Sequence, residues 1–210
     1  MGEAVIPFIA MERLRMETDG DGVTTLVAAK CCPLACHYCL NRRVLSEECP
    51  SRPVTVRELI DMVRIDDLYF RATGGGVVFG GGESLLHAEY IAEFAKARPK
   101  GWKVIAETCL NVPEELLRKA LPAVDYWIVD IKDMNPDIYR AYTGKDNARV
   151  KENLCILAEE GRAGDVTVRV PLIPEFNTEE DCRRSVDELV AIAKWNRLDV
   201  FRYIVRDSES

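Results

Sequence analysis

The chain has 210 residues, of which 48% are hydrophobic, enough to bury the core of one compact domain spanning residues 1–210. Lys and Arg together number 28 against 35 Asp and Glu, and the net charge of -7 disfavours nucleic acid and anionic membrane surfaces as partners. The apolar run from Ala4 to Met11 contains Pro7 and is too short to span a bilayer. With no recognisable secretion signal, we expect a cytoplasmic location, where eight cysteines indicate metal binding or buried thiols before disulfides.

Apolar runs rich in β-branched residues alternate with segments of helical spacing along the chain. The runs predict strands at residues 23–29, 77–79, 104–108, 126–130, 166–171 and 200–205. The segments between them predict helices at 56–70, 85–97, 113–120, 136–142, 150–160 and 179–194. This alternation predicts a parallel α/β fold. Six units are fewer than a closed barrel needs, so a partial (β/α)6 barrel and an open doubly wound sheet are the two candidates.

Charged side chains fall on one face of the predicted strands. In the fourth strand, Trp127, Val129 and Ile131 alternate with Ile128, Asp130 and Lys132. Val166, Val168 and Val170 alternate with Thr167 and Arg169 in the fifth strand, and Glu107 is placed similarly in the third. Unpaired ions in a dry core would cost several kcal/mol each, so these charges need one another or a charged ligand, unless the strand ends are solvated. We expect ligands at the carboxyl ends of the strands.

Three cysteines lie within eight residues directly after the first predicted strand, in Cys32-Pro-Leu-Ala-Cys36-His-Tyr-Cys39. Thiolates suit zinc or iron–sulfur clusters, but a structural zinc site normally has four ligands and the chain has no second Cys-x-x-Cys or His pair. Three thiolates on a four-iron four-sulfur cluster leave one iron open to an amine and a carboxylate. We therefore predict one such cluster on Cys32, Cys36 and Cys39.

The sequence gives weaker evidence of function for the remaining cysteines and for the histidines. Cys31 leaves the strand in the opposite direction from Cys32, which indicates a structural role. The scattered thiols are predicted to be small buried hydrophobes; these are Cys49, Cys109, Cys155 and Cys182. His37 is expected in a loop and His87 on a helix, and two histidines make a His-dependent hydrolase a poor candidate.

The spacing Cys-x-x-x-Cys-x-aromatic-Cys, with Tyr38 before the last cysteine, resembles the signature of the radical S-adenosylmethionine (SAM) superfamily. A second block from Gly74 to Glu83, followed by Ser84, resembles that family's Gly-Gly-Glu motif, in which glycine permits close approach to a ligand's amine and carboxylate. The distance between this block and the cysteines adds to the likeness, because a glycine-rich turn alone would be weak evidence.

More specifically, residues 19–205 resemble the activating enzymes of glycyl radical enzymes. The matching pieces are Asp19-Gly-Asp-Gly-Val23, the cysteine loop with Asn41-Arg42, the Gly-Gly-Glu block, Asp130-Ile-Lys132-Asp-Met-Asn135 and Arg169-Val-Pro-Leu-Ile-Pro174. The resemblance implies that SAM is bound by Tyr38, Gly81, Gly82, Glu83, Glu107, Asp130, Lys132 and Arg169. Glu107 stands where the family has aspartate, and its repulsion from Asp130 predicts a cation between them, such as a SAM ammonium, a sulfonium or a small metal ion.

The chain also departs from this family. Ser84 replaces a commoner proline, Leu40 a frequent histidine, and the chain runs from Tyr203 to Ser210 where the family usually continues with Leu-Pro-Tyr-His. One SAM contact is then missing, or Arg206 substitutes for it. No cysteine-rich insert lies between Asn41 and Gly74, so only one cluster is expected.

The resemblance implies reductive cleavage of SAM to a 5′-deoxyadenosyl radical, which abstracts hydrogen from a backbone glycine of a partner enzyme, with Asp19 and the barrel mouth gripping the loop that carries it. Flavodoxin or ferredoxin is the implied electron donor. The cofactors carry the difficult chemistry, so no side chain is assigned as a general acid or nucleophile. Two alternatives remain open at this point: a radical SAM enzyme for a small molecule or peptide, and a non-catalytic protein that keeps its cluster for sensing or binding.

Overall fold

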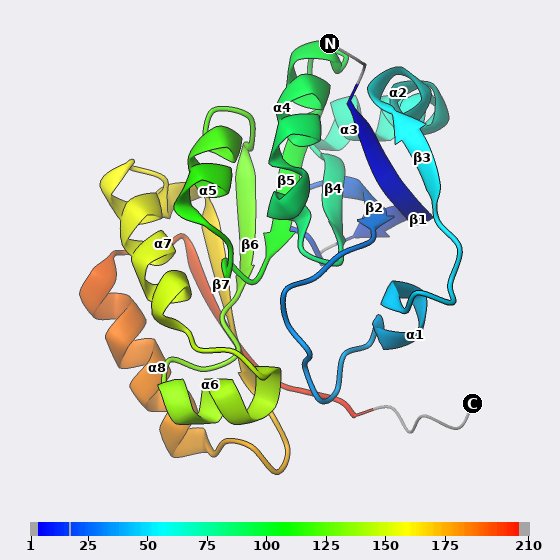
Figure 1. The fold of residues 1–210 in the computed structure, drawn as a ribbon. Helices are drawn as coiled ribbons and strands as arrows, with labels where there is room; N and C mark the ends of the chain where they lie inside the picture. The colour runs from blue at the N-terminus through cyan, green and yellow to red at the C-terminus, as the bar shows by residue number, and fades with distance from the viewer. Residues whose placement is uncertain (1–3, 17, 206–210) are drawn as a thin grey trace.

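Eight strands form one mixed sheet in the computed structural model, which describes residues 4–16 and 18–205 (Figure 1). Their order across the sheet is β3-β1-β2-β4-β5-β6-β7-β8. The strands are β1 (Val5–Met16), β2 (Val23–Ala29), β3 (Arg52–Thr55), β4 (Gly76–Gly81), β5 (Lys103–Thr108), β6 (Tyr126–Asp130), β7 (Val166–Leu172) and β8 (Arg197–Arg202). The six from β2 onward, leaving out β3, are parallel and lie in chain order. This order is that of the predicted partial (β/α)6 barrel, whereas a doubly wound sheet reverses direction part-way across.

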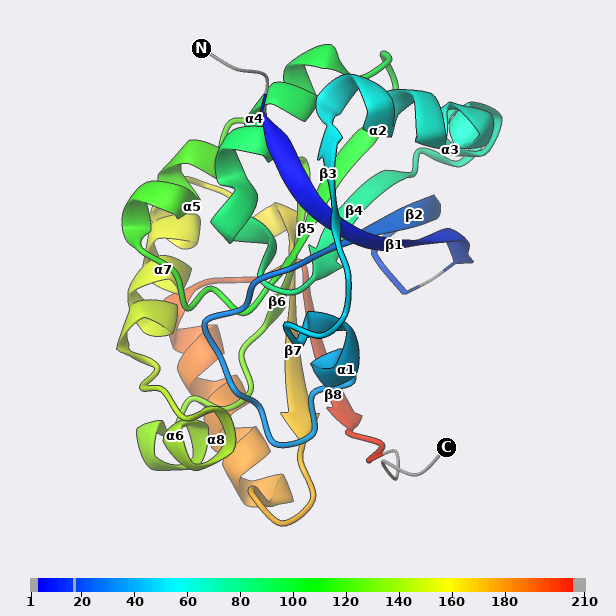
Figure 2. The same cartoon turned by 45° about the vertical axis from the view of Figure 1, so that its right-hand side comes forward.

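The helices connect these strands and lie along the outer side of the curved sheet, as Figures 1 and 2 both show for α4, α5, α7 and α8. The α-helices are α1 (Arg42–Leu45), α2 (Val56–Val63), α3 (Asp67–Thr73), α4 (Ala88–Ala97), α5 (Glu114–Ala120), α6 (Pro136–Thr143), α7 (Ala148–Glu159) and α8 (Glu179–Ile192). Thr55 and Thr178 begin α2 and α8 with capping boxes, and Asn135 caps α6 ahead of a proline in its first turn. Gly144 ends α6 in the left-handed conformation.

Two strands were not predicted from the sequence. β1 pairs antiparallel with β2 and, on its other side, with β3, which extends the sheet beyond the parallel part. The register of β1 slips between Phe8 and Ala10 and again between Glu12 and Arg15, and Leu14 has a φ of 55°. These bulges break the two-residue alternation that marks a strand in a sequence. β3 has only four residues and contains Pro53, so it carries no strand signal of its own.

Several boundaries predicted from the sequence differ from those in the structure, and two of the differences have a visible tertiary cause. The last strand is Arg197–Arg202 rather than 200–205, because its pairing with β7, from Thr167 opposite Arg197 onward, decides where it begins. The single helix predicted at 56–70 is interrupted by a 3₁₀ turn, η1 (Arg64–Asp66). In that turn the buried Asp66 carboxylate accepts a hydrogen bond from Thr25 at 2.8 Å and pairs with Arg13 at 3.2 Å. A tertiary contact invisible to helical periodicity therefore reshapes the helix.

The two faces of the sheet separate as predicted. Trp127, Val129 and Ile131, with Val166, Val168 and Val170, belong to the main hydrophobic core beneath the helices. A much smaller apolar group lies on the inner face, formed by Val78, Ile105 and Ile128 with Leu26 and Tyr126 packed against it. The polar inner residues line a cavity instead. Two further 3₁₀ segments, η2 (Ser84–His87) and η3 (Ala163–Asp165), complete the fold, and no helix within the described residues is long and apolar enough to cross a membrane.

Candidate functional site

A cavity of about 1010 Å³ occupies the inner side of the sheet. The predicted site residues line it, apart from Tyr38: Cys32, Cys36, Cys39, Gly81, Gly82, Glu83, Glu107, Asp130, Lys132 and Arg169. It also reaches the amino ends of the strands at Gly22, Tyr126 and Asn196. The curved sheet and the connection from β2 to α1 thus gather residues from five separate segments around one space, as parallel strands with a common carboxyl edge require.

The three cysteines sit on the connection between β2 and α1, which passes along the end of the sheet at which β7 and β8 point (Figure 2). The backbone N–H groups of Ala35 and His37 donate to the carbonyls of Thr143 and Tyr142, at 2.9 and 3.0 Å. Arg42 donates to the carbonyls of Cys36 and His37 at 2.8 and 2.6 Å. We call residues 31–39 the cysteine loop; these bonds hold its shape from both sides.

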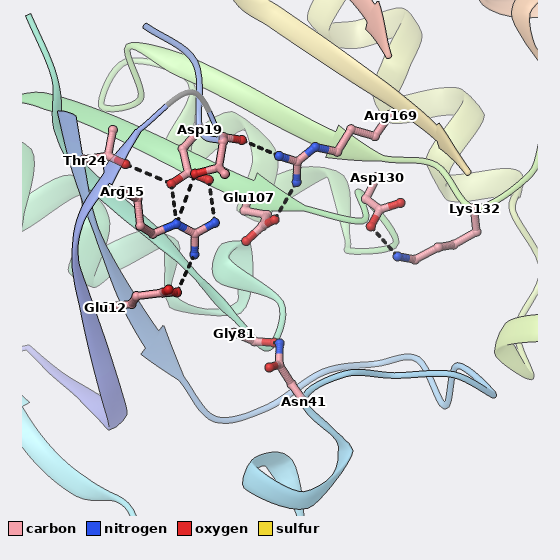
Figure 3. A network of polar contacts seen from close by, with 11 residues as sticks. Glu12, Arg15, Asp19, Thr24, Asn41, Gly81, Glu107, Asp130, Lys132 and Arg169 are labelled. Carbon is pink, nitrogen blue, oxygen red and sulfur yellow. Dashed lines mark hydrogen bonds and ion pairs between the residues drawn. The ribbon is translucent and has the colours of Figure 1, made fainter. Parts of the chain in front are cut away.

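Glycines at the end of β4 let this loop approach closely. The Gly82 N–H donates to the Ala29 carbonyl at 3.0 Å, and a Cβ on Gly82 would lie 2.1 Å from the Cys31 carbonyl oxygen. Cys31 itself has a φ of 77°, which directs that oxygen toward the N–H of Glu83, 2.8 Å away. Asn41 closes the arrangement by donating to the Gly81 carbonyl at 2.8 Å (Figure 3). The glycine block therefore contacts the cysteine loop directly, which the sequence motif did not reveal.

Glu83 is 2% exposed, and its carboxylate is saturated by protein donors. One oxygen accepts from Leu85 N–H at 3.0 Å and from the Thr108 hydroxyl at 2.6 Å. The other accepts from both the N–H and the thiol of Cys109, at 2.8 and 2.9 Å. Glu83 thereby ties the end of β4 to the end of β5, and the contact predicted between this residue and SAM stays a prediction.

Two ion pairs face the cavity from β5, β6 and β7 (Figure 3). The Arg169 guanidinium donates to Glu107 at 2.8 Å, and the Lys132 ammonium donates to Asp130 at 2.5 Å. Burial raises the pKa of Glu107, and the guanidinium opposes this. Burial alone would lower the pKa of Lys132, but the attractions of Asp130 and Cys36 together outweigh it, and the pKa lies well above its ordinary value.

These pairs bear out the prediction that the four charges need one another. Each carboxylate has a cation of the protein beside it, which already offsets the repulsion between Glu107 and Asp130, and the additional cation expected between them stays a prediction. One oxygen of Asp130 remains buried without a hydrogen-bond partner within the described residues. A buried acceptor of this kind is costly unless a ligand donor reaches it, so it fits an ammonium group at this place.

Asp19 does not face outward as its proposed role requires. It is 1% exposed, pairs with the Arg15 guanidinium at 2.8 Å and accepts from the Thr24 hydroxyl at 2.9 Å (Figure 3). Arg169 reaches the same turn by donating to the carbonyl of Thr18. The expectation that Asp19 grips a partner's loop is therefore corrected: its carboxylate holds the turn between β1 and β2 in place.

Aromatic rings surround the cysteine loop. Tyr38 does not line the cavity; its hydroxyl donates to Glu175 at 2.8 Å, and its ring lies 5.8 Å from that of Phe176. Tyr142 and Tyr203 do line the cavity. Sequence reasoning assigned no function to these two tyrosines, because neither belongs to a motif and only the fold brings them together. Arg206 lies outside the described residues.

The remaining thiols divide between core and surface. Cys109 and Cys182 are buried as predicted, but Cys155 is exposed on α7 and Cys49 only partly buried, so the prediction is wrong for Cys155. Cys31 is exposed. His37 lies in the cysteine loop as expected, and His87 ends η2 and precedes α4, where its ring donates to the Lys30 carbonyl at 2.9 Å.

The donor set at the cysteine loop suits a cluster better than a single ion. Within the described residues, no group of three His, Cys, Asp or Glu side chains is placed to hold one metal ion. Three thiols nevertheless share one cavity, as the corners of a cluster require. Cys32 is exposed and Cys36 half-buried, yet partial desolvation in the cavity raises the pKa of Cys32 to about 11 and also raises that of Cys36. Thiols take the charged form once iron is bound to them.

A partial β/α barrel with three convergent thiols, a glycine-lined strand end and paired charges defines the class as a cluster-dependent SAM enzyme. The radical SAM superfamily profile matches residues 26–189, and the chain belongs to this superfamily. A four-iron four-sulfur cluster and SAM are the cofactors of that family.

Curated relatives of this chain include activating enzymes. The chain is 31% identical over 205 residues to the pyruvate formate-lyase 2-activating enzyme of Escherichia coli, covering 83% of this chain and 70% of that one. It is 37% identical over 143 residues to the isethionate sulfite-lyase activating enzyme of Desulfovibrio desulfuricans, covering 64% of this chain and 46% of the relative. The chain thus spans about half the length of some of the curated relatives it matches. SuiB of Streptococcus suis bound to SAM shares the fold, with a TM-score of 0.65 over 84% of this chain and 39% of that one, at 14% identity.

Proposed function

We propose that this protein is an activating enzyme for a glycyl radical enzyme, with the cluster on Cys32, Cys36 and Cys39. The observation that carries the proposal is the convergence of those thiols, the Gly81–Gly82 backbone and the Asp130–Lys132 pair on one cavity. The names of the relatives support the choice of substrate, since each is an activating enzyme for a named lyase. The partner's identity and the electron donor, a flavodoxin or ferredoxin, are part of the same proposal.

The chain's own residues have four tasks in this reaction. Cys32, Cys36 and Cys39 would hold the cluster through three thiolates, leaving one iron without a protein ligand. The unpartnered Asp130 oxygen would accept from the ammonium of SAM, and Lys132 would offer its charge to the carboxylate. Glu83 and Arg42 keep the glycines and the cysteine loop in register. The inner face of the curved sheet forms one wall of the cavity.

When bound, the cluster and SAM would supply the one-electron reductive cleavage of SAM to methionine and the abstraction of a hydrogen atom from a glycine Cα of the partner. The products are 5′-deoxyadenosine and a glycyl radical, and an external one-electron reductant restores the cluster. No side chain needs to act as acid, base or nucleophile.

The test is anaerobic reconstitution with iron and sulfide counting, then reduction in the presence of SAM and assay for 5′-deoxyadenosine. Cys36→Ala should lose the cluster, whereas Cys31→Ala, the matched control on the exposed neighbouring thiol, should keep it. A candidate glycyl radical partner added to the reaction should give a glycyl radical signal in electron paramagnetic resonance. A full cluster without 5′-deoxyadenosine would refute the enzymatic proposal and favour a sensing or binding role. 5′-Deoxyadenosine without a partner radical would favour a small molecule or peptide as substrate.

A further inference from the structure

Glu175 holds a strained backbone conformation in the loop between β7 and α8. Its φ of 68° lies in the left-handed region, where a residue with a Cβ is disfavoured and glycine is usual. Residues of this kind cost about 1–3 kcal/mol each and gather at functional sites, where the surrounding structure imposes them. Cys31 and Lys132 also have a positive φ, and both belong to the site described above. Glu175 has no task in the proposed reaction, so its strain points to a separate role.

The loop that carries this residue is braced at its base. The backbone N–H groups of Phe176 and Asn177 both donate to the Ile173 carbonyl, each at 3.2 Å. The Asn177 side chain accepts from the Ile173 N–H at 2.6 Å and donates to the Pro171 carbonyl at 3.0 Å. It also donates to the Asp133 carboxylate at 2.9 Å, which ties the loop to the end of β6. The tip of the loop therefore has a fixed direction.

That tip reaches the cysteine loop beyond the carboxyl ends of the strands (Figure 2). The Glu175 carboxylate accepts from the Tyr38 hydroxyl at 2.8 Å. The half-buried Phe176 ring lies 4.9 Å from that of His37, 5.8 Å from that of Tyr38 and 5.1 Å from that of Tyr142. Glu175 and Phe176, which we call the clasp, do not line the cavity and contact the cysteine loop from outside.

The clasp covers the turn that carries two of the three thiols. His37 and Tyr38 are the two residues between Cys36 and Cys39, and the Cys39 N–H donates to the Cys36 carbonyl across them at 3.3 Å. Groups just outside the ligands of a metal centre orient those ligands and control the access of water to it. Solvent exposure is also one of the factors that set the reduction potential of an iron–sulfur cluster.

The sign of the effect on the potential follows from charge. A reduced cluster carries one more negative charge than an oxidised one, and water stabilises the higher charge better than an apolar ring does. Phe176 therefore disfavours reduction, and the anionic carboxylate of Glu175 acts in the same direction. Loss of either side chain should raise the potential.

We propose that Glu175 and Phe176 are positioning residues for the cluster. The clasp fixes the turn between Cys36 and Cys39 from outside and keeps water from it, which slows the loss of iron and lowers the reduction potential. This inference rests on the proposed function, because it assumes a cluster on the cysteine loop. It also explains the strained φ of Glu175, since glycine would relax the backbone but leave the Tyr38 hydroxyl without its partner.

The first test measures two properties of anaerobically reconstituted variants. One is the rate of iron release to a ferrous-iron chelator, and the other is the midpoint potential from a redox titration followed by electron paramagnetic resonance. Phe176→Ala should release iron about 10- to 100-fold faster and have a more positive potential. Phe176→Leu keeps most of the apolar bulk and should show smaller changes in both. Glu179→Ala, which removes an exposed carboxylate from the first turn of α8, is the matched control and should behave like the wild type.

The second test isolates the bond between Tyr38 and Glu175. Tyr38→Phe and Glu175→Ala each remove it, so the double variant should release iron no faster than the faster of the two single variants. Glu175→Gly removes the same carboxylate but relaxes the backbone. It should therefore unfold at a higher temperature than Glu175→Ala while releasing iron as fast, which a purely structural role would not produce.

Wild-type iron release and potential in Phe176→Ala, with 5′-deoxyadenosine still formed, would overturn the inference and leave the proposed function intact. Faster iron release at an unchanged potential would overturn it too, since water would then play no part. Additive effects in the double variant, or equal changes in Glu179→Ala, would also contradict it. If Phe176→Ala does not fold, Phe176→Leu and the Tyr38–Glu175 pair decide the question. A wild type that takes up no cluster would overturn the proposed function and this inference together.

Discussion

Replacing Glu83 by glutamine separates a structural role from a ligand role for this residue. In the folded protein the carboxylate accepts four hydrogen bonds from protein donors while only 2% exposed. Glutamine keeps one acceptor oxygen, which can serve Leu85 and Thr108. Its NH₂ group then faces the N–H of Cys109, so two hydrogen-bond donors meet and neither has an acceptor. Because the site is buried, water cannot replace the lost acceptor.

The magnitude follows from the two bonds that are lost. Hydrogen bonds to a charged group contribute about 1.5–3 kcal/mol each, so Glu83→Gln should lower the free energy of unfolding by about 3–6 kcal/mol. In a chain of this size each kcal/mol lowers the melting temperature by roughly 2–4 °C. The expected fall is therefore large against a total stability of about 5–15 kcal/mol.

The assay is thermal and guanidinium unfolding of the cluster-free protein under reducing, anaerobic conditions, followed by circular dichroism. Glu89→Gln is the matched control, because this residue lies on α4 with 75% of its side chain exposed and only a 3.7 Å pair with Lys119. It should change stability by less than about 0.5 kcal/mol. If Glu83→Gln were as stable as the wild type but failed to bind SAM, the carboxylate would be a cofactor ligand and the structural reasoning would be wrong.

Two further changes test the site and its pH response. Gly82→Ala places a methyl group 2.1 Å from the Cys31 carbonyl oxygen, so it should lower the free energy of unfolding by about 3 kcal/mol or more and reduce iron uptake on reconstitution. Gly164→Ala, where a Cβ meets nothing within 4 Å, is the control and should change neither quantity. Equal iron uptake by the two variants would contradict the close packing at Gly82. Burial lowers the pKa of His87 below 6.5, so the stability it contributes is present above pH 6.5 and is lost as pH falls through the lowered pKa. Wild-type protein should therefore lose more unfolding free energy between pH 7 and pH 5 than His87→Gln, whose amide can still donate to the Lys30 carbonyl; identical losses in denaturant titrations at the two pH values would contradict this.

The parallel part of the fold could be predicted because its signals are local. The runs at β2 and β6 match their strands residue for residue, since hydrophobic alternation and flanking turns lie within each segment. The antiparallel strands β1 and β3 escaped prediction because the bulges in β1 and the proline in β3 remove that periodicity. The break at Asp66 escaped because its cause is a bond to Thr25, forty-one positions away.

The site divides in the same way. The three thiols within eight residues and the glycine block are local sequence features. The sequence alone therefore predicted the cysteine loop and the kind of cofactor it suits. It also predicted that Asp130, Lys132 and Arg169 face the inner side of the sheet. Only the tertiary structure shows that the carboxylates of Glu83 and Asp19 accept hydrogen bonds from donors of the protein itself. It also shows that Tyr203 lies against the cysteine loop. The physical reason is that a side chain's partners depend on which distant segments the fold brings within hydrogen-bond reach, and no local pattern records that distance.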